Sequence, residues 1–576
     1  MRTYDKLLAK SRRDGCEITL AEHTRQVIEA AETLFGTRSE PTRLGRCWLR
    51  FFNLNEDHWP AFHANLLAAC ALHDWGKAND GFQDAVRGKP DSQTIRHEHL
   101  SALLIGLPEI GHWLQGKPHL DLAIVLSAVL THHLKAAASP SSADGFAVRR
   151  GGRKTVQFLH NHDDFRHLLT EAVKRLGPET LDSVRFPEIW RYDQGPTSIY
   201  AHRERLTKDI LRPLRMNWIE PDATAITGRQ MLLAVRVGLI AADAAGSALV
   251  RQGKTSAWIQ QCFGESPYWS GKRVFDEVIH PRIAQINEQF TNRGQPPFQW
   301  DGIQSACDDL PRRALLLAPC GSGKTLAAWR WIAAQADRNP VNRVIFLYPT
   351  RATAKEGFRD YVSWAPEAAL MHSTAAFDLH DMFDNESDPR HGMSYEAERR
   401  MFALGFWPKR AFSATVDQFL AFTQYSYSAI CMLPVLADSV LVVDEVHSFD
   451  RHMFSALKHF LRRFDIPVLC MTATLTQDRR SQLEECGLHT YDKRSGKTAN
   501  VAEQPRYRLT VAESRDTAAE RVRDALGIGR RILWVVNTVA RCHEIAAMFA
   551  KSLDTASPDA DLRTQDGQPI YCYHSH

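Results

Sequence analysis

The stretch ALHDWGKAND, residues 71–80, gathers side chains of the kinds that bind metal ions and phosphate. His73 supplies an imidazole nitrogen, Asp74 a carboxylate and Lys77 a cation within one short segment. Imidazole and carboxylate together suit divalent transition metals, which can activate water for hydrolysis. The stretch therefore raises the hypothesis of a catalytic metal centre.

The His-Asp dipeptide alone is weak evidence in a chain with 25 histidines. It recurs at His162-Asp163 and at His380-Asp381, and both copies lie in polar surroundings. We interpret these two copies as surface pairs. The rest of the chain must decide whether the first copy is different.

Further imidazoles and one more carboxylate accompany apolar stretches with helical spacing, at what we expect to be helix edges. They are His23 in LAEHTRQV, His97 in RHEHLSALL, His132 and His133 after AIVLSAVLT, and Asp243, the only acid in MLLAVRVGLIAADAAGSALV. A buried aspartate needs a partner or a metal. Each residue taken singly also fits an ordinary surface or core position, and His99 competes with His97 for the same ligand position. The combined set suits Mn²⁺, Fe²⁺, Co²⁺, Ni²⁺ or Zn²⁺.

A second chemistry appears in APCGSGKT, which follows the strand-like ALLLAP and precedes the helix-like LAAWRWIAA. This order is that of a phosphate-binding loop. Gly321, Ser322 and Gly323 would let backbone amides point at phosphates, helped by the helix N-terminus. Lys324 would reach the β- and γ-phosphates, and the Thr325 hydroxyl would bind Mg²⁺.

The stretch DEVH follows another apolar run and completes a nucleotide site. Asp444 would hold Mg²⁺, and Glu445 would orient and deprotonate the attacking water. Carboxylates at the C-terminal end of a parallel strand face the same crevice as the phosphate loop. The two motifs together predict ATP hydrolysis.

The elements that must position these residues divide the chain into four parts. Residues 1–255 are mostly helical by apolar spacing, and residues 256–297 have the composition of a connector. From residue 298 to 500, short apolar runs alternate with helix-like stretches, which indicates a parallel sheet. Residues 501–576 look like the beginning of a second α/β lobe, with strands expected at RYRLTV and ILWVV.

Composition excludes several classes of protein. The chain of 576 residues has 44% hydrophobic and 24% charged residues, as ordinary multidomain globular proteins have. We find no secretory signal, and the most apolar run, residues 231–250, is interrupted by Arg236 and Asp243. The eleven cysteines form no C-x-x-C pair and predict reduced core residues of a cytoplasmic protein. The net charge of +4 does not by itself indicate a nucleic-acid partner.

The C-terminal half resembles superfamily 2 helicases by six motifs in order, which include the phosphate loop and DEVH. The resemblance implies that Gln304 reads adenine with Phe298 as a stacking partner. It also implies that Thr350 and Arg351 of PTRAT and Thr415 of ATVDQFL contact a nucleic-acid strand, and that TAT (472–474) couples hydrolysis to domain movement. VVNTVAR resembles the start of the second lobe of that family. Its later motifs have no counterpart, so we expect that the chain as given does not unwind duplexes processively.

The N-terminal half resembles the HD phosphohydrolase superfamily, and the two halves together resemble the nuclease-helicase effector of type I CRISPR systems. That resemblance implies two metal ions bridged by Asp74. One would be held by His23, His73, Asp74 and Asp243, and the other by Asp74, His97, His132 and His133. Lys77 would lie near the scissile phosphate.

We therefore expect a monomeric enzyme of the cytoplasm with no membrane partner. It would degrade single-stranded DNA in antiviral defence, using ATP and Mg²⁺ in the helicase lobe, and the resemblance implies recruitment by an RNA-guided surveillance complex. Two alternatives stay open: an HD phosphohydrolase acting on nucleotides with a regulatory ATPase lobe, and a truncated form that binds without unwinding. The basic loop AVRRGGRKTV is a candidate path for a single strand.

Overall fold

The computed structural model forms two compact units, Met1–Ser495 and Gly496–His576, which are treated separately below. The residues that the structure describes are 4–11, 17–89, 93–133, 146, 154–177, 184–193, 195, 198–216, 223–249, 255–264, 268–319, 321–339, 341–350, 353–355, 357, 362–365, 368–371, 404–420, 427–492 and 509–550.

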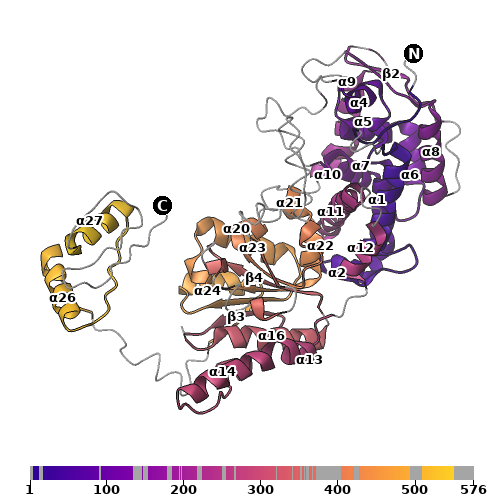
Figure 1. Cartoon of the computed structure of the whole chain (residues 1–576). Helices are drawn as coiled ribbons and strands as arrows, with labels where there is room; N and C mark the ends of the chain where they lie inside the picture. Colours follow the sequence, from indigo (N-terminus) through magenta and orange to yellow (C-terminus); the bar gives the residue numbers. More distant parts are fainter. Residues whose placement is uncertain are drawn as a thin grey trace. The chain divides into compact units, whose positions relative to one another are not determined.

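The N-terminal part of the first unit is helical, as the sequence predicts (Figure 1). Its elements are α1 (Leu20–Phe35), α2 (Arg43–Phe51), η1 (Glu56–His58), α3 (Trp59–Leu72), η2 (Trp75–Lys77), α4 (Asp80–Val86), α5 (His97–Ile105), α6 (Pro108–Gln115), α7 (Leu122–Thr131), α8 (Asp163–Leu176), α9 (Ile199–Leu206), η4 (Thr207–Leu211), α10 (Arg212–Met216), α11 (Ala223–Leu249) and α12 (Thr255–Phe263). One small antiparallel pair, β1 (Thr155–Gln157) and β2 (Ile189–Arg191), lies among them.

Helix α1 shows how local sequence sets these helices. The Thr19 side chain accepts a hydrogen bond from the Glu22 amide and caps the first turn. Gly36, at φ 122°, ends the helix in a conformation that a side chain would disfavour. The helix covers the residues LAEHTRQVIEAAETLF that periodicity predicts.

Helix α11 is the central helix of this part and packs against α1, α3 and α7. By length and composition, residues Thr224–Ser247 of this helix would suffice to cross a membrane. More than half of its apolar segment is, however, buried inside the protein. Packing on three helices accounts for its apolar composition, and we attach no membrane role to it. It carries Asp243 well inside its length, so the expectation that every candidate ligand stands at a helix edge is wrong for this residue.

The C-terminal part of the first unit is built on a parallel sheet. Among the described residues, the sheet has seven strands in the order β5-β6-β4-β7-β8-β3-β9. Their bounds are β3 (Arg313–Leu317), β4 (Arg343–Tyr348), β5 (Ala368–Met371), β6 (Ala411–Thr415), β7 (Ser439–Val443), β8 (Val468–Thr472) and β9 (His489–Tyr491). The four runs that the sequence predicts as strands are β3, β4, β7 and β8, and they are four consecutive strands of the sheet, in the order β4-β7-β8-β3.

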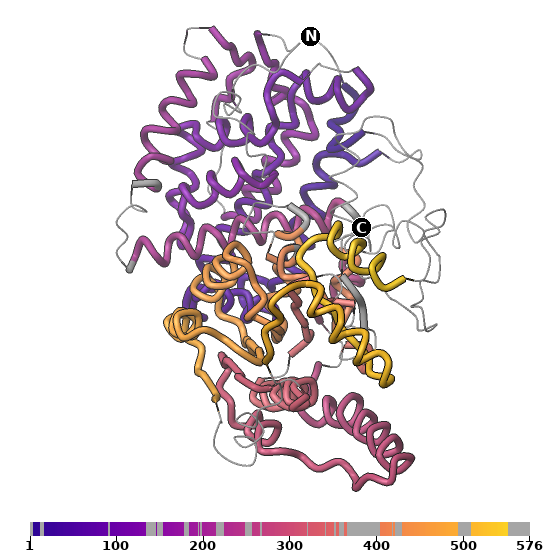
Figure 2. Tube along the Cα trace, turned by 90° about the vertical axis from the view of Figure 1, so that its left-hand side faces the viewer, coloured from indigo at the N-terminus to yellow at the C-terminus, as the bar shows by residue number. Residues whose placement is uncertain are grey.

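The helices of this lobe cover the sheet (Figures 1 and 2). They are α13 (Gly271–Val274), η6 (Phe275–Ile279), α14 (His280–Asn292), α15 (Gly302–Ala306), α16 (Lys324–Arg338), η7 (Val362–Trp364), α20 (Val416–Phe419), α21 (Tyr427–Ile430), α22 (Leu433–Ala437), η9 (Val446–Ser448), α23 (Arg451–Arg463) and α24 (Gln477–Glu484). The segment 256–297, expected to be a connector, is largely helical. Its helix α12 packs on α1 and its helix α13 packs on α16.

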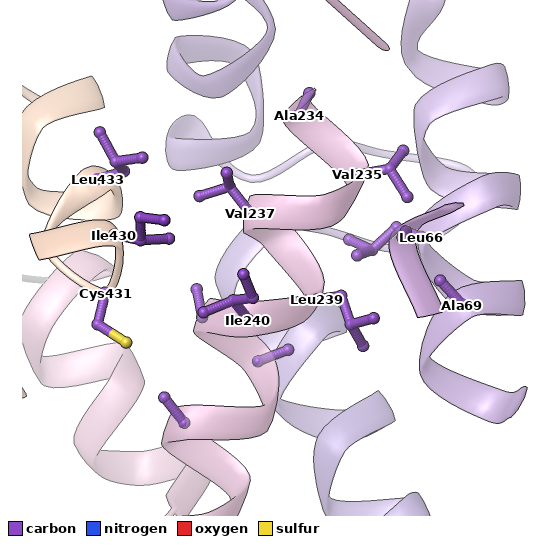
Figure 3. Close-up of a cluster of buried hydrophobic side chains, with 14 of the residues drawn as sticks. Leu66, Ala69, Ala234, Val235, Val237, Leu239, Ile240, Ile430, Cys431 and Leu433 are labelled. Atoms are coloured by element: carbon purple, nitrogen blue, oxygen red, sulfur yellow. The ribbon is translucent and has the colours of Figure 1, made fainter. Parts of the chain in front are cut away.

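The helical part and the sheet lobe share one hydrophobic core. Figure 3 shows α11 between the two: Leu66 of α3 lies near Val235 and Leu239 on one side, and Ile430 and Leu433 of the lobe lie near Val237 on the other. Because α11 also carries Asp243, a helix of the candidate metal centre packs directly against the nucleotide lobe.

The second unit is described over residues 509–550 and contains the helices α26 (Arg515–Gly527) and α27 (Val539–Phe549). The strand expected at ILWVV, residues 532–536, is not formed in the described part of this unit. Leu533 and Val535 are 86% and 78% exposed there. A strand needs a neighbour for its backbone hydrogen bonds, and none of the described residues of this unit supplies one.

Candidate metal centre and nucleotide site

Asp74 is the hub of a buried cluster in the helical part. Its Oδ2 lies 3.2 Å from His23 Nε2, 3.2 Å from His73 Nε2 and 2.6 Å from Lys77 Nζ. Its Oδ1 lies 3.4 Å from His97 Nε2. The cluster brings together residues from α1, the end of α3 and the start of α5.

The candidate ligands fall into two groups, and within each group the donor atoms lie within 4.8 Å of one another. One group is His23, His73 and Asp74, and the other is His97, His132 and His133. Asp243 joins the first group, because its Oδ1 lies 3.3 Å from His23 Nε2. These groups correspond to the two metal positions that the sequence resemblance implies.

The backbone orients two of the histidines. Nδ1 of His73 donates to the carbonyl of Cys70 at 2.8 Å, and Nδ1 of His132 donates to the carbonyl of Val129 at 2.6 Å. Each ring stands at the C-terminal end of its helix, where carbonyls are available. Nε2 of each ring is thereby turned toward the cluster, and in the neutral ring this nitrogen is the acceptor that a metal requires.

Buried polar atoms without hydrogen-bond partners show that this donor set fits metal ions. In the described part of the chain, Nε2 of His23, His73 and His132 and both carboxylate oxygens of Asp74 have no hydrogen bond of acceptable geometry. The Asp74 oxygens have ion pairs, but buried ring nitrogens without a hydrogen bond cost on the order of 1–3 kcal/mol each. Coordination of divalent ions would satisfy them, and nitrogen with oxygen donors suits Mn²⁺, Fe²⁺, Co²⁺, Ni²⁺ or Zn²⁺.

Burial and the neighbouring charges set the protonation of the cluster. Burial tends to raise the pKa of Asp74, but the charges of His73 and Lys77 outweigh it and hold that pKa well below its usual value. Burial, followed by the charge of Lys77, holds the pKa of His97 well below its usual value. Burial also lowers the pKa of His132, so an ionised carboxylate faces neutral rings there.

The histidine that competes with His97 lies apart from the cluster. His99 packs its ring on Phe146, with centroids 4.7 Å apart, and its Nδ1 lies 3.9 Å from Glu98. His97 Nε2 instead lies 2.9 Å from His133 Nε2. Helix α5 therefore directs His97 into the group and His99 away from it.

A tight turn after Asp74 brings α5 against the cluster. The Gly76 amide donates to Ser101 Oγ at 2.8 Å, and a Cβ on Gly76 would lie 2.1 Å from the carbonyl of His97. The close approach requires glycine. Sequence reasoning did not identify this contact or Ser101.

Two further polar residues of the site were not predicted. Ser247 Oγ donates to Asp243 Oδ1 at 2.9 Å from the next turn of α11. The spacing of four residues on a helix was a readable signal for this pair. The other residue is Gln83, which contacts Leu8, 75 residues away in sequence, and nothing in its local pattern indicated that contact.

The second copy of the His-Asp dipeptide, at residues 162–163, has a structural role. The side chain of His162 caps α8 by accepting from the Asp164 amide, and its Nε2 donates to the carbonyl of Tyr4. The third copy, His380-Asp381, lies outside the described residues, as do Arg149, Arg150 and Arg153 of the basic loop.

The phosphate-binding loop lies between β3 and α16. Gly321 and Gly323 have φ values of 79° and 70°, which only glycine adopts without strain. Lys324 is the first residue of α16, Thr325 follows it, and Ser322 Oγ donates to the carbonyl of Pro319 at 2.7 Å. The predicted loop residues therefore sit at a helix N-terminus, which favours phosphate.

The DEVH residues follow β7 beside this loop. Asp444 is buried at the end of the strand, and Glu445 Oε1 lies 3.0 Å from Lys324 Nζ. The other carboxylate oxygen of Glu445 lies 3.0 Å from His447 Nδ1, which also lies 2.9 Å from Thr472 Oγ1 of the TAT motif. Glu445 has φ 50°, a strained value that for a residue other than glycine is characteristic of functional sites.

Gln304 lies at the same site. Its side chain and that of Asp301 form a capping box on α15, and its Nε2 lies 3.5 Å from the carbonyl of Gly323. Phe298 packs edge-on against Trp300. The glutamine that resemblance assigns to adenine thus contacts the phosphate loop.

The structure describes two of the three predicted nucleic-acid residues. Thr350 is exposed just after β4, where its Oγ1 lies 2.9 Å from Thr353 Oγ1. Thr415 ends the neighbouring strand β6 and is buried. Arg351 lies outside the described residues. Thr350 is accessible to a nucleic-acid strand, whereas the Thr415 side chain is largely covered by protein.

The described cysteines are all free, in agreement with the prediction of reduced thiols. They are Cys47, Cys70, Cys262, Cys307, Cys431, Cys470, Cys486 and Cys542. Burial raises the pKa of Cys262 to about 12, so this thiol stays protonated.

Comparisons with known proteins agree with both sites. Residues 8–196 match the family model described as Cas3, HD domain, and residues 297–482 match that described as DEAD/DEAH box helicase. A CRISPR-associated nuclease/helicase Cas3 of Myxococcus xanthus is 32% identical over 557 residues, covering 94% of this chain and 69% of that protein. The CRISPR-associated endonuclease/helicase Cas3 of Escherichia coli is 28% identical over 238 residues, covering 37% of this chain and 26% of that protein.

A solved structure supports the fold. The chain described as "Crystal structure of CRISPR-associated protein" superposes with a TM-score of 0.53 at 16% identity, covering 98% of this chain and 64% of that one. A helical HD domain followed by a parallel-sheet helicase lobe, together with the extent of the match to the Myxococcus xanthus relative, leads to one conclusion. The chain belongs to the Cas3 family of CRISPR-associated nucleases/helicases.

Proposed function

We propose that this protein degrades single-stranded DNA at the HD centre and moves the strand with the ATPase lobe. The observation that carries the proposal is the position of Asp74 between two adjacent groups of histidines. A carboxylate shared by two ligand groups is the arrangement that two-metal phosphodiester hydrolysis requires. The proposed ligands are His23, His73, Asp74, His97, His132, His133 and Asp243.

Two divalent ions, when bound there, would lower the pKa of a water and stabilise the leaving oxygen. The residues supply the rest. Cys70 and Val129 carbonyls orient two imidazoles with Nε2 toward the cluster, and the low pKa of Asp74 keeps this carboxylate ionised. Lys77, 2.6 Å from Asp74 and nearly buried, would hold a phosphate oxygen of the scissile group by charge.

In the helicase lobe, we assign ATP with Mg²⁺ to the loop Gly321–Thr325 and to Asp444. Glu445 is the proposed base for the attacking water, and Gln304 the proposed adenine contact. Nucleotide phosphates would compete with Glu445 for Lys324, since the two side chains now pair at 3.0 Å. The His447–Thr472 contact would carry the state of this site toward the segment after β8.

The remaining assignments rest on the family. The proposed partners are single-stranded DNA and an RNA-guided surveillance complex, and a solved structure of such a complex, described as pre-nicking, is among the matches. We propose that the protein is a monomer. We also propose that it acts in the cytoplasm, with which the free cysteines are consistent. The proposed residues for strand contact are Thr350, Arg351 and Thr415.

The test is cleavage of circular single-stranded DNA by the purified full chain, with and without Mn²⁺, Co²⁺ or Ni²⁺. A circle has no ends and is no small nucleotide, so its cleavage separates a nuclease from a nucleotide phosphohydrolase. We expect metal-dependent cleavage that Asp74→Ala abolishes while the protein stays folded. An intact circle together with hydrolysis of free nucleotides would overturn the proposal.

A further inference from the structure

A histidine that binds a metal ion through Nε2 needs an acceptor for the hydrogen on its Nδ1. His73 and His132 each stand at the C-terminal end of a helix. There the carbonyls of Cys70 and Val129 accept that hydrogen. His97 stands at the opposite kind of position, as the first residue of α5. The free backbone groups of a first turn are N–H donors, so the helix itself offers this ring no acceptor.

The acceptor that faces Nδ1 of His97 is the carboxylate of Glu98, whose Oε2 lies 3.5 Å away. In the described part of the chain, Nδ1 of His97 makes no hydrogen bond to a backbone carbonyl. The separation of 3.5 Å is slightly longer than an ordinary N–H···O hydrogen bond. Glu98 is therefore the group that can do for His97 what backbone carbonyls do for the two helix-end histidines.

The other neighbours of Glu98 determine which of its oxygens faces the ring. Glu98 is buried, and its Oε1 lies 3.8 Å from a guanidinium nitrogen of Arg96 and 3.9 Å from Nδ1 of His99. Both of these neighbours are basic, as a buried carboxylate requires. Arg96 and His99 thus hold Oε1, and Oε2 is the oxygen turned toward His97.

The neighbouring ligand shows why the position of the His97 hydrogen matters. Nε2 of His97 lies 2.9 Å from Nε2 of His133. Two nitrogen lone pairs repel each other at this distance, so one of the two rings carries a hydrogen on Nε2. A neutral imidazole has a single N–H, and the nitrogen that carries it cannot bind a metal ion. Both rings can therefore be ligands only when their hydrogens are on Nδ1.

We propose that Glu98 is a positioning residue of the second ligand group, which comprises His97, His132 and His133. It holds the hydrogen of His97 on Nδ1 and so presents Nε2 to the metal ion. A bound cation makes the remaining N–H of a ligand ring a stronger donor, so the contact between Nδ1 and Oε2 closes to a hydrogen bond. Loss of such a carboxylate partner typically weakens metal binding by roughly 10–100-fold. The inference rests on the proposed metal centre.

The experiment measures Mn²⁺ binding to the purified full chain by isothermal titration calorimetry at neutral pH. Glu98→Leu removes the acceptor, whereas Glu98→Gln keeps an acceptor oxygen and loses the charge. We expect Glu98→Leu to raise the dissociation constant of one Mn²⁺ ion roughly 10–100-fold and to leave that of the other ion unchanged. Glu98→Gln should lie between Glu98→Leu and the wild type, because its amide oxygen still accepts the hydrogen of Nδ1.

A variant of the second ligand group identifies which ion is affected. His133→Ala should bind a single ion, and adding Glu98→Leu to His133→Ala should leave the affinity for that ion unchanged. Glu109→Leu is the matched control, because Glu109 is an exposed glutamate of the next helix, α6. It should leave both dissociation constants at their wild-type values.

Wild-type affinity for both ions in the Glu98 variants would overturn the inference. Equal weakening of both ions would also overturn it, because a purely structural role of Glu98 predicts that result. If Glu98→Leu does not fold, Glu98→Gln decides: selective weakening of one ion supports the inference, and wild-type affinity for both contradicts it. A wild-type chain that binds no Mn²⁺ would instead remove the proposed metal centre, and no variant is needed to see this.

Discussion

At the residue scale, the HD centre depends on buried ring nitrogens that make no hydrogen bond of acceptable geometry. The sequence predicts which imidazoles and carboxylates take part, because their types and apolar surroundings are readable. It does not predict which nitrogen of each ring faces inward. That choice depends on the carbonyls of Cys70 and Val129, three residues before His73 and His132, and becomes evident only when the helix ends are known.

A buried histidine away from the centre gives a test of acid stability. Burial, followed by the charge of Arg38, lowers the pKa of His63 to about 4. An unfolded histidine titrates near pH 6.5, so the unfolded chain takes up a proton at this residue between pH 6.5 and 4 and the folded chain does not. His63 therefore lowers stability as the pH falls through this window, by up to about 1.4 kcal/mol per pH unit.

We expect His63→Phe to flatten the dependence of the unfolding free energy on pH between 6.5 and 4. The measurement is chemical denaturation of both proteins at several pH values. The difference between the two proteins isolates this residue from the other histidines. Parallel curves would contradict the assignment of a neutral buried ring.

At the element scale, the turn η2 determines how closely α5 approaches the centre. A Cβ at Gly76 would lie 2.1 Å from the His97 carbonyl and 2.7 Å from the Ser101 amide, both of them backbone atoms that cannot move alone. Helix α5 would have to shift and take His97 with it. The geometry of the second ligand group therefore depends on one glycine.

We expect Gly76→Ala to destabilise the chain by roughly 1–3 kcal/mol through overpacking and to weaken metal binding. Thermal unfolding and metal titration measure the two effects. Gly228→Ala is the matched control on α11, since a Cβ there meets nothing within 4 Å. The control should stabilise the helix by about 0.5–1 kcal/mol. Wild-type metal affinity in Gly76→Ala would show that the turn does not position the ligands.

The segment after β7, which carries Glu445, gives a second prediction at this scale. Glu445, held in a left-handed conformation after β7, pairs with Lys324 at 3.0 Å. We expect Glu445→Gln to bind ATP at least as tightly, because the lysine loses its competing carboxylate. Hydrolysis should fall by roughly 10²–10⁴, because the base is lost. Binding of a fluorescent ATP analogue and phosphate release measure the two effects, and wild-type turnover in the variant would exclude Glu445 as the base.

At the scale of the whole first unit, a buried ion triad joins the helical part to the sheet lobe. Asp438, directly before β7, pairs with Arg43 of α2 and lies 3.5 Å from Arg343 of β4. Asp438 and Arg343 have no exposed side-chain surface, and burial lowers the pKa of Arg343 to about 10. Beside the triad, Phe51 stacks on Phe464 with centroids 4.6 Å apart.

We expect Asp438→Asn to destabilise the unit by about 3–5 kcal/mol, because it leaves buried arginine charge without its carboxylate. The control is Arg462→Ala, which removes an exposed pair with Glu485 and should cost less than about 1 kcal/mol. Calorimetry should show the helical part and the lobe unfolding in separate transitions in Asp438→Asn. A single transition at the wild-type temperature would contradict a joining role for the triad.

Sequence reasoning reached the parts of this unit that local pattern specifies. Helix α1 and the strands β3, β4, β7 and β8 follow from periodicity and apolar runs, and the phosphate loop from its glycines. It did not reach the helices of residues 256–297, the position of Asp243 inside α11, or the triad of Arg43, Arg343 and Asp438. Those features depend on contacts between residues up to 395 positions apart, which no local pattern encodes.

The central claim is that Asp74 is shared by two metal ions that cut DNA. The most direct measurement is the number of Mn²⁺ ions bound per chain, by native mass spectrometry, on the same samples whose cleavage of circular single-stranded DNA is followed. We predict two ions in the wild-type chain, at most one in His133→Ala, none held tightly in Asp74→Ala, and cleavage only where two are bound. Full cleavage by Asp74→Ala, or by a wild-type chain that holds no metal, would contradict the claim.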